Sequence, residues 1–253
     1  MDLKGKIALV MGGGMGIGHG CAIALAHAGA RIIICDIDGS ALRKTAREIR
    51  TIRSDCAITT LHKNMFEWDG LGPDIKSVSN PDQIDILVTG PVSTVRKPVL
   101  KLAPEEYTQI FNDNCVSHIY LAKLVAQNMI RRKSGGSIVF ISSVYGSLVR
   151  EGSAPYDIAK AGLNQATRVL AKEWAKYGIL VNAIAPGFTD TPGERKFATD
   201  AEIAEVVNKL PLRRAGTPQD IGEVAVMLAS SKHITGQIIT VDGGHSLVDL
   251  YDK

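Results

Sequence analysis

The stretch that decides the fold lies near the start of the chain and reads Ile7-Ala8-Leu9-Val10-Met11-Gly12-Gly13-Gly14-Met15-Gly16-Ile17-Gly18. Its apolar half predicts a buried strand, and its glycines predict a tight turn into a helix. Glycine has no Cβ to keep a pyrophosphate away from the backbone, and a helix N-terminus offers free N–H groups. The pattern is Gly12-x-x-x-Gly16-x-Gly18 and not a literal G-x-G-x-x-G, so it fits a plain strand-to-helix turn as well as dinucleotide binding. In the second interpretation the binding residues are Gly12, Met15, Gly16, Ile17 and Gly18.

Short apolar runs recur along the chain with helical stretches between them, which is typical of repeated βα units. Strands are predicted at Ile7 to Met11, Arg31 to Cys35, Ala57 to Leu61, Ile84 to Thr89, Ser137 to Ser142, Leu180 to Ala185 and Gln237 to Val241. Helices are predicted at Gly16 to Ala28, Ser40 to Arg53, Pro104 to Arg132, Pro155 to Tyr177, Thr199 to Lys209 and Pro218 to Ser230. Glycines and prolines leave room for one short helix at most in Phe66 to Pro81. The predicted fold is α/β, with residues 1–253 as a single doubly wound Rossmann domain. It has a seven-stranded, mainly parallel sheet and helices on both faces.

Composition excludes several classes of protein. The 253 residues are 45% hydrophobic and 22% charged, which is close to the globular average and argues against disorder and coiled coil. The net charge of +3 is spread along the chain, and the run Arg131-Arg132-Lys133 suits a helix end, so no nucleic-acid partner is expected. The first apolar run is too short for a signal peptide or a membrane span, so a cytoplasmic protein is expected. Cysteine and histidine spacings predict neither disulfides nor a metal site, and the reduced thiols are Cys21, Cys35, Cys56 and Cys115.

Asp36 ends the second predicted strand, 18 residues beyond Gly18. A carboxylate at this strand end can accept hydrogen bonds from the adenosine ribose hydroxyls, and it repels a 2′-phosphate. No Arg or Lys lies between Asp36 and Ser40 to hold such a phosphate. The sequence therefore favours NAD over NADP, while the alternative is that Asp36, with Asp38, caps the next helix.

Tyr156 and Lys160 are spaced i, i+4 at the start of a predicted helix, and Ser143 follows the fifth strand thirteen residues before Tyr156. Hydride transfer between an alcohol carbon and nicotinamide needs a general acid or base on the oxygen. Tyr156 is predicted to be that base, with a pKa lowered by the ammonium of Lys160. The Ser143 hydroxyl would hold the carbonyl or alkoxide oxygen. The alternative makes Tyr156 a core residue and Lys160 a solvated helix charge.

With these residues in place, the whole sequence resembles a short-chain dehydrogenase/reductase. The motifs that carry the resemblance are Gly12-x-x-x-Gly16-Ile17-Gly18, Asp85-Ile86-Leu87-Val88, Ser143, Tyr156-x-x-x-Lys160, Asn182-x-x-x-Pro186-Gly187 and Val241-Asp242-Gly243-Gly244. The resemblance implies that Asn114 completes the catalytic set by holding a proton-relay water near the lysine. From the residues alone, Asn114 is a polar residue that interrupts a long helix, bonded to a backbone carbonyl. Relatives of this type commonly form homotetramers, which the resemblance implies here.

The resemblance also implies the remaining cofactor contacts. Tyr156 and Lys160 would contact the nicotinamide ribose, and the nicotinamide-side loop would comprise Pro186, Gly187, Thr189 and Thr191. Two departures stand out. The family's N-N-A-G is replaced by Thr89-Gly90-Pro91-Val92, in which Gly90 still allows close approach to the ribose while Pro91 removes an N–H. The family's Asp-Val beside the adenine is replaced by Asn64-Met65, whose amide can still accept a hydrogen bond.

These observations predict an NAD-dependent oxidoreductase acting on a secondary alcohol or ketone of the sugar, polyol, steroid, hydroxy-acid or 3-oxoacyl type. The segment 188–216 is expected to cover this small-molecule substrate. The basic residues near the loops that could face it are Arg96, Lys97, Arg150 and Arg195, and each is expected to be a solvated charge. A non-catalytic NAD-binding protein is the main alternative, motivated by the altered turn at Thr89 to Val92. An epimerase or dehydratase that uses bound NAD transiently is a third possibility.

Overall fold

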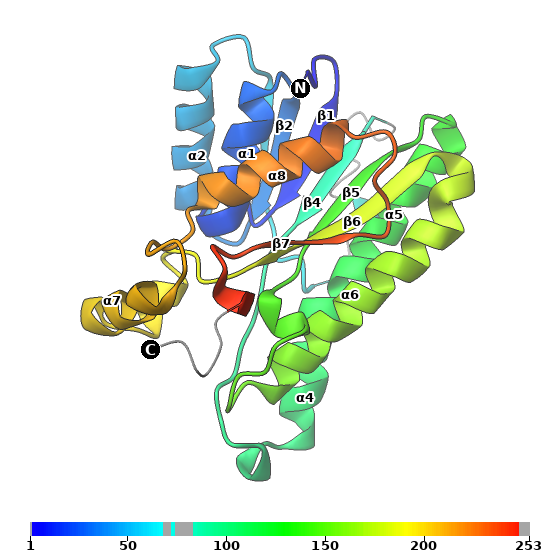
Figure 1. Cartoon of the computed structure of the whole chain (residues 1–253). Helices are drawn as coiled ribbons and strands as arrows, with labels where there is room; N and C mark the ends of the chain where they lie inside the picture. The colour runs from blue at the N-terminus through cyan, green and yellow to red at the C-terminus, as the bar shows by residue number, and fades with distance from the viewer. Residues whose placement is uncertain (1, 68–71, 74–82, 248–253) are drawn as a thin grey trace.

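The strands form one sheet in the computed structural model, which describes residues 2–67, 72–73 and 83–247 (Figure 1). Its order is β3-β2-β1-β4-β5-β6-β7, and every strand pair within the described residues is parallel. The strands are β1 (Ile7–Met11), β2 (Arg31–Asp36), β3 (Ile58–His62), β4 (Ile86–Thr89), β5 (Gly136–Ile141), β6 (Ile179–Pro186) and β7 (Ile238–Val241). The predicted doubly wound α/β fold is confirmed.

Helices cover both faces of the sheet (Figure 1). One face carries α1 (Gly16–His27), α2 (Gly39–Ile52) and α8 (Pro218–Ser230), which pack on Ala8 and Val10 of β1. The other carries α5 (Ser117–Arg132) and α6 (Ala154–Trp174), which pack on Leu9 and Met11. Because successive strand residues point to opposite faces, one apolar strand serves two cores.

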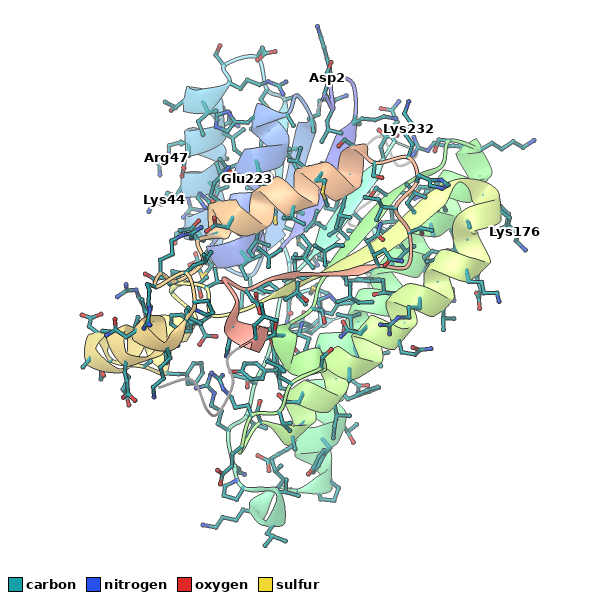
Figure 2. All side chains as sticks on the ribbon, viewed as in Figure 1. Asp2, Lys44, Arg47, Lys176, Glu223 and Lys232 are labelled. Carbon is teal, nitrogen blue, oxygen red and sulfur yellow. The ribbon has the colours of Figure 1, made fainter. Side chains whose placement is uncertain are left out.

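The surface helices are amphipathic, as α2 illustrates. Leu42, Ala46 and Ile49 are buried against the sheet, whereas Lys44 and Arg47 point away from it into solvent (Figure 2). No helix in the described part of the chain combines the length and apolar character that crossing a membrane requires.

The predicted elements recur with small shifts, and one prediction changes in kind. The single helix expected from Pro104 to Arg132 consists of α4 (Pro104–Phe111), a π-helical turn at Asn112–Val116, and α5. The helix expected from Pro155 to Tyr177 is α6 followed by a 3-10 turn at Ala175–Tyr177. Most of Phe66 to Pro81 lies outside the described residues.

The strand order reverses between β1 and β4, and ligands bind in such sheets outside the carboxyl ends of the strands at that reversal. The glycine turn after β1, the turn after β4 and the residues that follow β5 and β6 all lie at this edge. The candidate site is therefore built from segments far apart in the sequence. The segment 188–216 leaves the same edge and contains α7 (Asp200–Lys209), which extends away from the sheet (Figure 1).

Candidate active site

The glycine turn after β1 has the backbone that only glycine adopts readily. Gly12 and Gly16 have φ of +75° and +55°, in the left-handed region. The N–H groups of Gly12 and Gly13 both donate to the Cys35 carbonyl, at 2.7 and 3.1 Å, which fixes the turn against β2. A Cβ on Gly18 would lie 2.1 Å from the Gly12 carbonyl oxygen. The glycines thus let α1 start directly over the turn and leave its N-terminal groups open.

Asp36 is anchored beside this turn with its carboxylate almost buried. Its Oδ2 accepts the Gly14 N–H at 2.9 Å, and its Oδ1 accepts the Asp38 N–H at 3.1 Å. The cap of α2 is Asp38, which accepts from the N–H groups of Ser40 and Ala41. Asp36 is therefore not needed as the helix cap, and each of its oxygens keeps a lone pair for a ligand.

Sequence reasoning overlooked two basic groups near Asp36. A Cβ placed on Gly39 would lie 3.5 Å from an Arg43 guanidinium nitrogen and 3.4 Å from Nδ1 of His62. Arg43 lies one turn into α2, beyond the interval in which a phosphate-binding cation was sought, and His62 ends β3. The strand end that carries Asp36 is thus followed, three residues on, by a position with an arginine and a histidine beside it.

A buried histidine holds the altered turn after β4. His118 on α5 lies with Nδ1 2.7 Å from the Thr89 hydroxyl and Nε2 3.0 Å from the Pro91 carbonyl oxygen. Burial lowers the pKa of His118 to about 3, so the ring is neutral and carries one proton. Because a carbonyl only accepts, Nε2 donates to Pro91 and Nδ1 accepts from Thr89. Sequence reasoning missed His118, since nothing local to it signals this contact.

Gly90 packs closely against β5. A Cβ on Gly90 would lie 3.2 Å from Cγ1 of Ile141, and Pro91 packs against Gly12, where an added Cβ would lie 3.1 Å from its ring. The turn after β4 therefore sits directly beside the glycine turn. Pro91 has no N–H to donate, but the hydrogen bond from His118 holds its carbonyl in place, so the turn is fixed.

The structure brings Ser143, Tyr156 and Lys160 together at the end of β5. Ser143 caps a 3-10 turn at Val144–Gly146 and makes a side-chain hydrogen bond with Tyr156. Lys160 is fully buried, its Nζ donates to the Ile141 carbonyl at 2.9 Å, and it lies 5.5 Å from the centre of the Tyr156 ring. The alternative in which Lys160 is a solvated helix charge is therefore wrong.

The expected effect of Lys160 on Tyr156 is corrected by the structure. Burial raises the pKa of Tyr156 to about 12, and the hydrogen bond with Ser143 and the charge of Arg150 oppose this rise only in part. Burial also lowers the pKa of Lys160 to about 7, so its ammonium is partly discharged at neutral pH. Desolvation, which disfavours the charged form of each group, is the largest cause of both pKa shifts.

Asn114 lies in the π-helical turn and is fully buried. Its amide donates to the carbonyls of Ile110 at 2.9 Å and Ser93 at 2.8 Å, so the expected bond to a backbone carbonyl is present. Its Oδ1 is buried with no hydrogen-bond partner among the described residues. Such an orphaned acceptor calls for a donor that the chain itself does not provide, and a π-turn is often found at functional sites.

The loop after β6 faces the glycine turn. A Cβ on Gly16 would lie 3.6 Å from Thr191, so the two predicted phosphate-side positions are adjacent. Thr189 is buried and bonded to the Gly187 carbonyl, and Gly187 packs so tightly on Asp242 that a Cβ would lie 2.5 Å away. Pro186, the last residue of β6, starts this loop.

The predicted adenine-side pair divides into two roles. The Asn64 Oδ1 accepts the Phe66 N–H at 3.0 Å, which makes it a turn residue with one lone pair remaining. The side chain of Met65 is buried, and its sulfur lies 3.9 Å from the Thr89 hydroxyl. The Met65 side chain thus belongs to the core.

Comparison with known proteins identifies the family. Residues 12–246 match the family model described as enoyl-(acyl carrier protein) reductase. A tropinone reductase homologue of Arabidopsis thaliana is 34% identical over 252 residues, covering 96% of this chain and 94% of its own. A solved structure of a putative gluconate dehydrogenase from Agrobacterium tumefaciens is 34% identical with a TM-score of 0.88, covering 96% of this chain and 97% of its own. The chain belongs to the short-chain dehydrogenase/reductase family, whose members bind a nicotinamide dinucleotide, and its curated relatives include dehydrogenases and reductases.

A further relative bears on the dinucleotide. The structure of a putative 2-deoxy-D-gluconate 3-dehydrogenase from Agrobacterium tumefaciens contains bound NADP. It is 27% identical, has a TM-score of 0.87 and covers 97% of this chain and 98% of its own. Relatives of this fold therefore include NADP-binding proteins.

Proposed function

We propose that the protein is an NAD(H)-dependent oxidoreductase that interconverts a secondary alcohol and a ketone. The observation that carries the proposal is the convergence of Ser143, Tyr156 and Lys160 at the sheet edge where the glycine turn opens. Ser143 holds the carbonyl or alkoxide oxygen, and the Tyr156 hydroxyl exchanges a proton with that oxygen. Replacement of this proton is assigned to buried Lys160, 5.5 Å from the Tyr156 ring centre, and to the unsatisfied oxygen of Asn114.

The residues fit a nicotinamide dinucleotide, which when bound supplies the hydride acceptor or donor. The left-handed backbone at Gly12 and Gly16 forms a cradle that a side chain would fill, and Asp36 lies at its end. The proposed cofactor contacts are Gly12, Met15, Gly16, Ile17, Gly18, Asp36, Asn64, Met65, Gly90, Tyr156, Lys160, Pro186, Gly187, Thr189 and Thr191.

NAD is proposed over NADP because the Asp36 carboxylate is held at the ribose end of the cradle by two backbone N–H groups. A 2′-phosphate there would meet a fixed negative charge. Calorimetric titration with NADH and NADPH tests this, with NADH expected to bind at least tenfold more tightly. Equal or tighter binding of NADPH would refute it, and Arg43→Gln would then show whether Arg43 holds the phosphate.

Turnover distinguishes an enzyme from a non-catalytic NAD-binding protein. Ketone-dependent oxidation of NADH is expected across a panel of ketones, and Tyr156→Phe is expected to abolish it. Tight NADH binding without turnover of any panel member would favour the binding protein. Accumulation of NADH with an alcohol substrate would exclude an epimerase or dehydratase that regenerates its own cofactor.

We also propose that residues 188–216 cover the substrate. The base of this segment is closed by backbone hydrogen bonds of 2.9 Å between Asp190 and Gly216 and between Gly216 and Phe188. Such a neck allows the segment to move as a unit over the site. Limited proteolysis with and without NADH and substrate tests this, since closure should protect the segment.

A homotetramer is proposed from the outward face of α4 and α6. Phe111, Ile158 and Val169 are 37%, 53% and 45% exposed on helices that have no other covering layer. Light scattering that finds a monomer would refute this. The four cysteines are buried and form no disulfide in the structure, which suits the reducing cytoplasm, the proposed location.

A further inference from the structure

One cation beside the catalytic residues has no acidic partner. Of the four basic residues singled out near the site loops, three are paired: Lys97 with Glu106 at 2.6 Å, Arg195 with Asp190 at 2.6 Å, and Arg96 with Glu194 at 3.8 Å. Arg150 forms no ion pair with any residue that the structure describes. Its guanidinium instead lies over the ring of Tyr145, 4.5 Å from the ring centre. A guanidinium that is half-buried and has no carboxylate paired with it is suited to bind an anion.

Arg150 is positioned at the catalytic site by its own backbone. Its N–H donates to Oδ2 of Asp157 at 2.9 Å, next to Tyr156, while Tyr145 lies two residues beyond Ser143. The charge of Arg150 acts on Tyr156 and lowers its pKa against the effect of burial. The guanidinium therefore lies near the place where the reacting oxygen must bind.

His245 lies on the other side of Tyr145. The two rings meet edge to face with centres 5.9 Å apart, which brings the turn after β7 against the turn after β5 (Figure 1). Nδ1 of His245 is buried without a hydrogen-bond partner among the described residues, and burial lowers the pKa of the ring. A buried N–H without an acceptor is costly, so the single proton belongs on Nε2, which is left free to donate to a ligand.

Among the described residues, the neighbouring carboxylates form no ion pair with Arg150 or His245 and accept backbone N–H groups instead. Asp242 accepts the N–H groups of Gly244 and Ser246 at 2.9 and 2.7 Å, and Asp157 accepts that of Arg150. Glu194, whose charge also reaches Tyr156, lies beside Arg96. Arg150 and His245 thus remain as two donors with Tyr145 between them.

We propose that Arg150 and His245 form a subsite for a carboxylate of the substrate, so that the reaction interconverts a hydroxy acid and a keto acid. A guanidinium matches a carboxylate through two parallel hydrogen bonds, and stacking on Tyr145 holds its plane in place. The inference rests on the proposed function, because it assigns the substrate class of that same site. It also orients the substrate, with the carboxylate toward Tyr145 and the secondary alcohol toward Tyr156.

Calorimetry with matched pairs of ligands tests the subsite in protein saturated with NAD. The probes are D-gluconate against D-glucitol and 3-hydroxybutyrate against 1,3-butanediol, since each pair differs only by carboxylate in place of CH₂OH. We expect at least one acid to bind tenfold or more tightly than its neutral partner. Arg150→Gln should remove most of this preference, His245→Phe should reduce it, and Arg168→Gln, at an exposed arginine of α6, should retain it.

The outcomes separate this inference from the proposed function. Absence of an acid preference in both pairs, or a preference that survives Arg150→Gln, would overturn the subsite, whatever the turnover of neutral ketones. Acid binding that depends on Arg150, without hydride transfer to any probe, would support the subsite and count against the proposed reaction. If Arg150 acts only on Tyr156, Arg150→Gln will shift the pH profile of kcat and leave the ratio of acid to neutral affinity unchanged, which also overturns the subsite. NADH affinity and the melting temperature serve as checks that the variants fold.

Discussion

Replacing Lys160 by methionine should make the stability of the ligand-free protein respond differently to pH. Lys160 is fully buried on α6, and its pKa falls to about 7 in the folded chain because burial disfavours the ammonium. In the unfolded chain the same group titrates near the ordinary lysine value of about 10.4. Between these two values the unfolded state binds more protons, so the free energy of unfolding rises with pH.

The size of the effect follows from these two pKa values. One pH unit changes the free energy of unfolding by at most about 1.4 kcal/mol for one proton, and Lys160 is already half deprotonated near pH 7 in the folded state. From pH 7 to pH 9 the wild type should therefore gain about 2 kcal/mol relative to Lys160→Met. The neighbouring thiol of Cys115, whose pKa burial raises to about 11, is present in both proteins and stays protonated in the folded state over this range.

Urea unfolding of the wild type and of Lys160→Met at pH 7, 8 and 9 measures this difference. The contributions of titratable groups that the two proteins share cancel in the comparison. Lys172→Met, at an exposed lysine on the same helix, is the matched control and should show no such trend. A difference between wild type and Lys160→Met that stays constant from pH 7 to 9 would refute the argument. It would mean that the folded chain keeps Lys160 protonated, supported by the Ile141 carbonyl alone.

Two further substitutions test the cofactor cradle. Gly18→Ala would place a Cβ 2.1 Å from the Gly12 carbonyl oxygen, so we expect the free energy of unfolding in urea to fall by about 1–3 kcal/mol and NADH to bind more weakly. Gly193→Ala is the control, because its added Cβ would lie 3.7 Å from the nearest atom, and it should change neither quantity. His118→Phe leaves the Pro91 carbonyl without its donor and should cost about 1–3 kcal/mol, with a larger loss in NADH affinity than in kcat. Unchanged NADH affinity in His118→Phe would show that the histidine only fills the core.

The sequence predicts the sheet well because its signals are local. Each apolar run of the sheet is bounded by turn residues, and the first turn is indicated by its glycine content alone, from Gly12 to Gly18. The spacing of Tyr156 and Lys160 likewise requires nothing beyond helical periodicity. Predictions of this kind rest on neighbours in the chain, so strand and helix positions are recovered within a few residues.

Predictions about charge failed where tertiary packing decides. The direction of the Tyr156 pKa was wrong, because the depth of burial around the ring depends on elements distant in the sequence. Arg43 was overlooked for a different reason: it lies beyond the interval from Asp36 to Ser40 in which a cation was sought, although helical periodicity places it beside Gly39. The π-helical turn at Asn114 was missed for a similar reason, since its extra residue is stabilised by the contact with Ser93 from another segment.

The geometry of the turn after β4 removes the main reason for considering a non-catalytic NAD-binding protein. That alternative arose because Thr89 to Val92 replaces the usual family residues, which suggested a damaged cofactor site. His118 lies 27 residues beyond Pro91 and fixes the turn at both Thr89 and Pro91, and Gly90 retains its close approach to Ile141. A neutral, fully buried ring with both nitrogens hydrogen-bonded makes the turn rigid. The substitution in the turn and the histidine on α5 are therefore best understood together, as one arrangement that keeps the cradle intact.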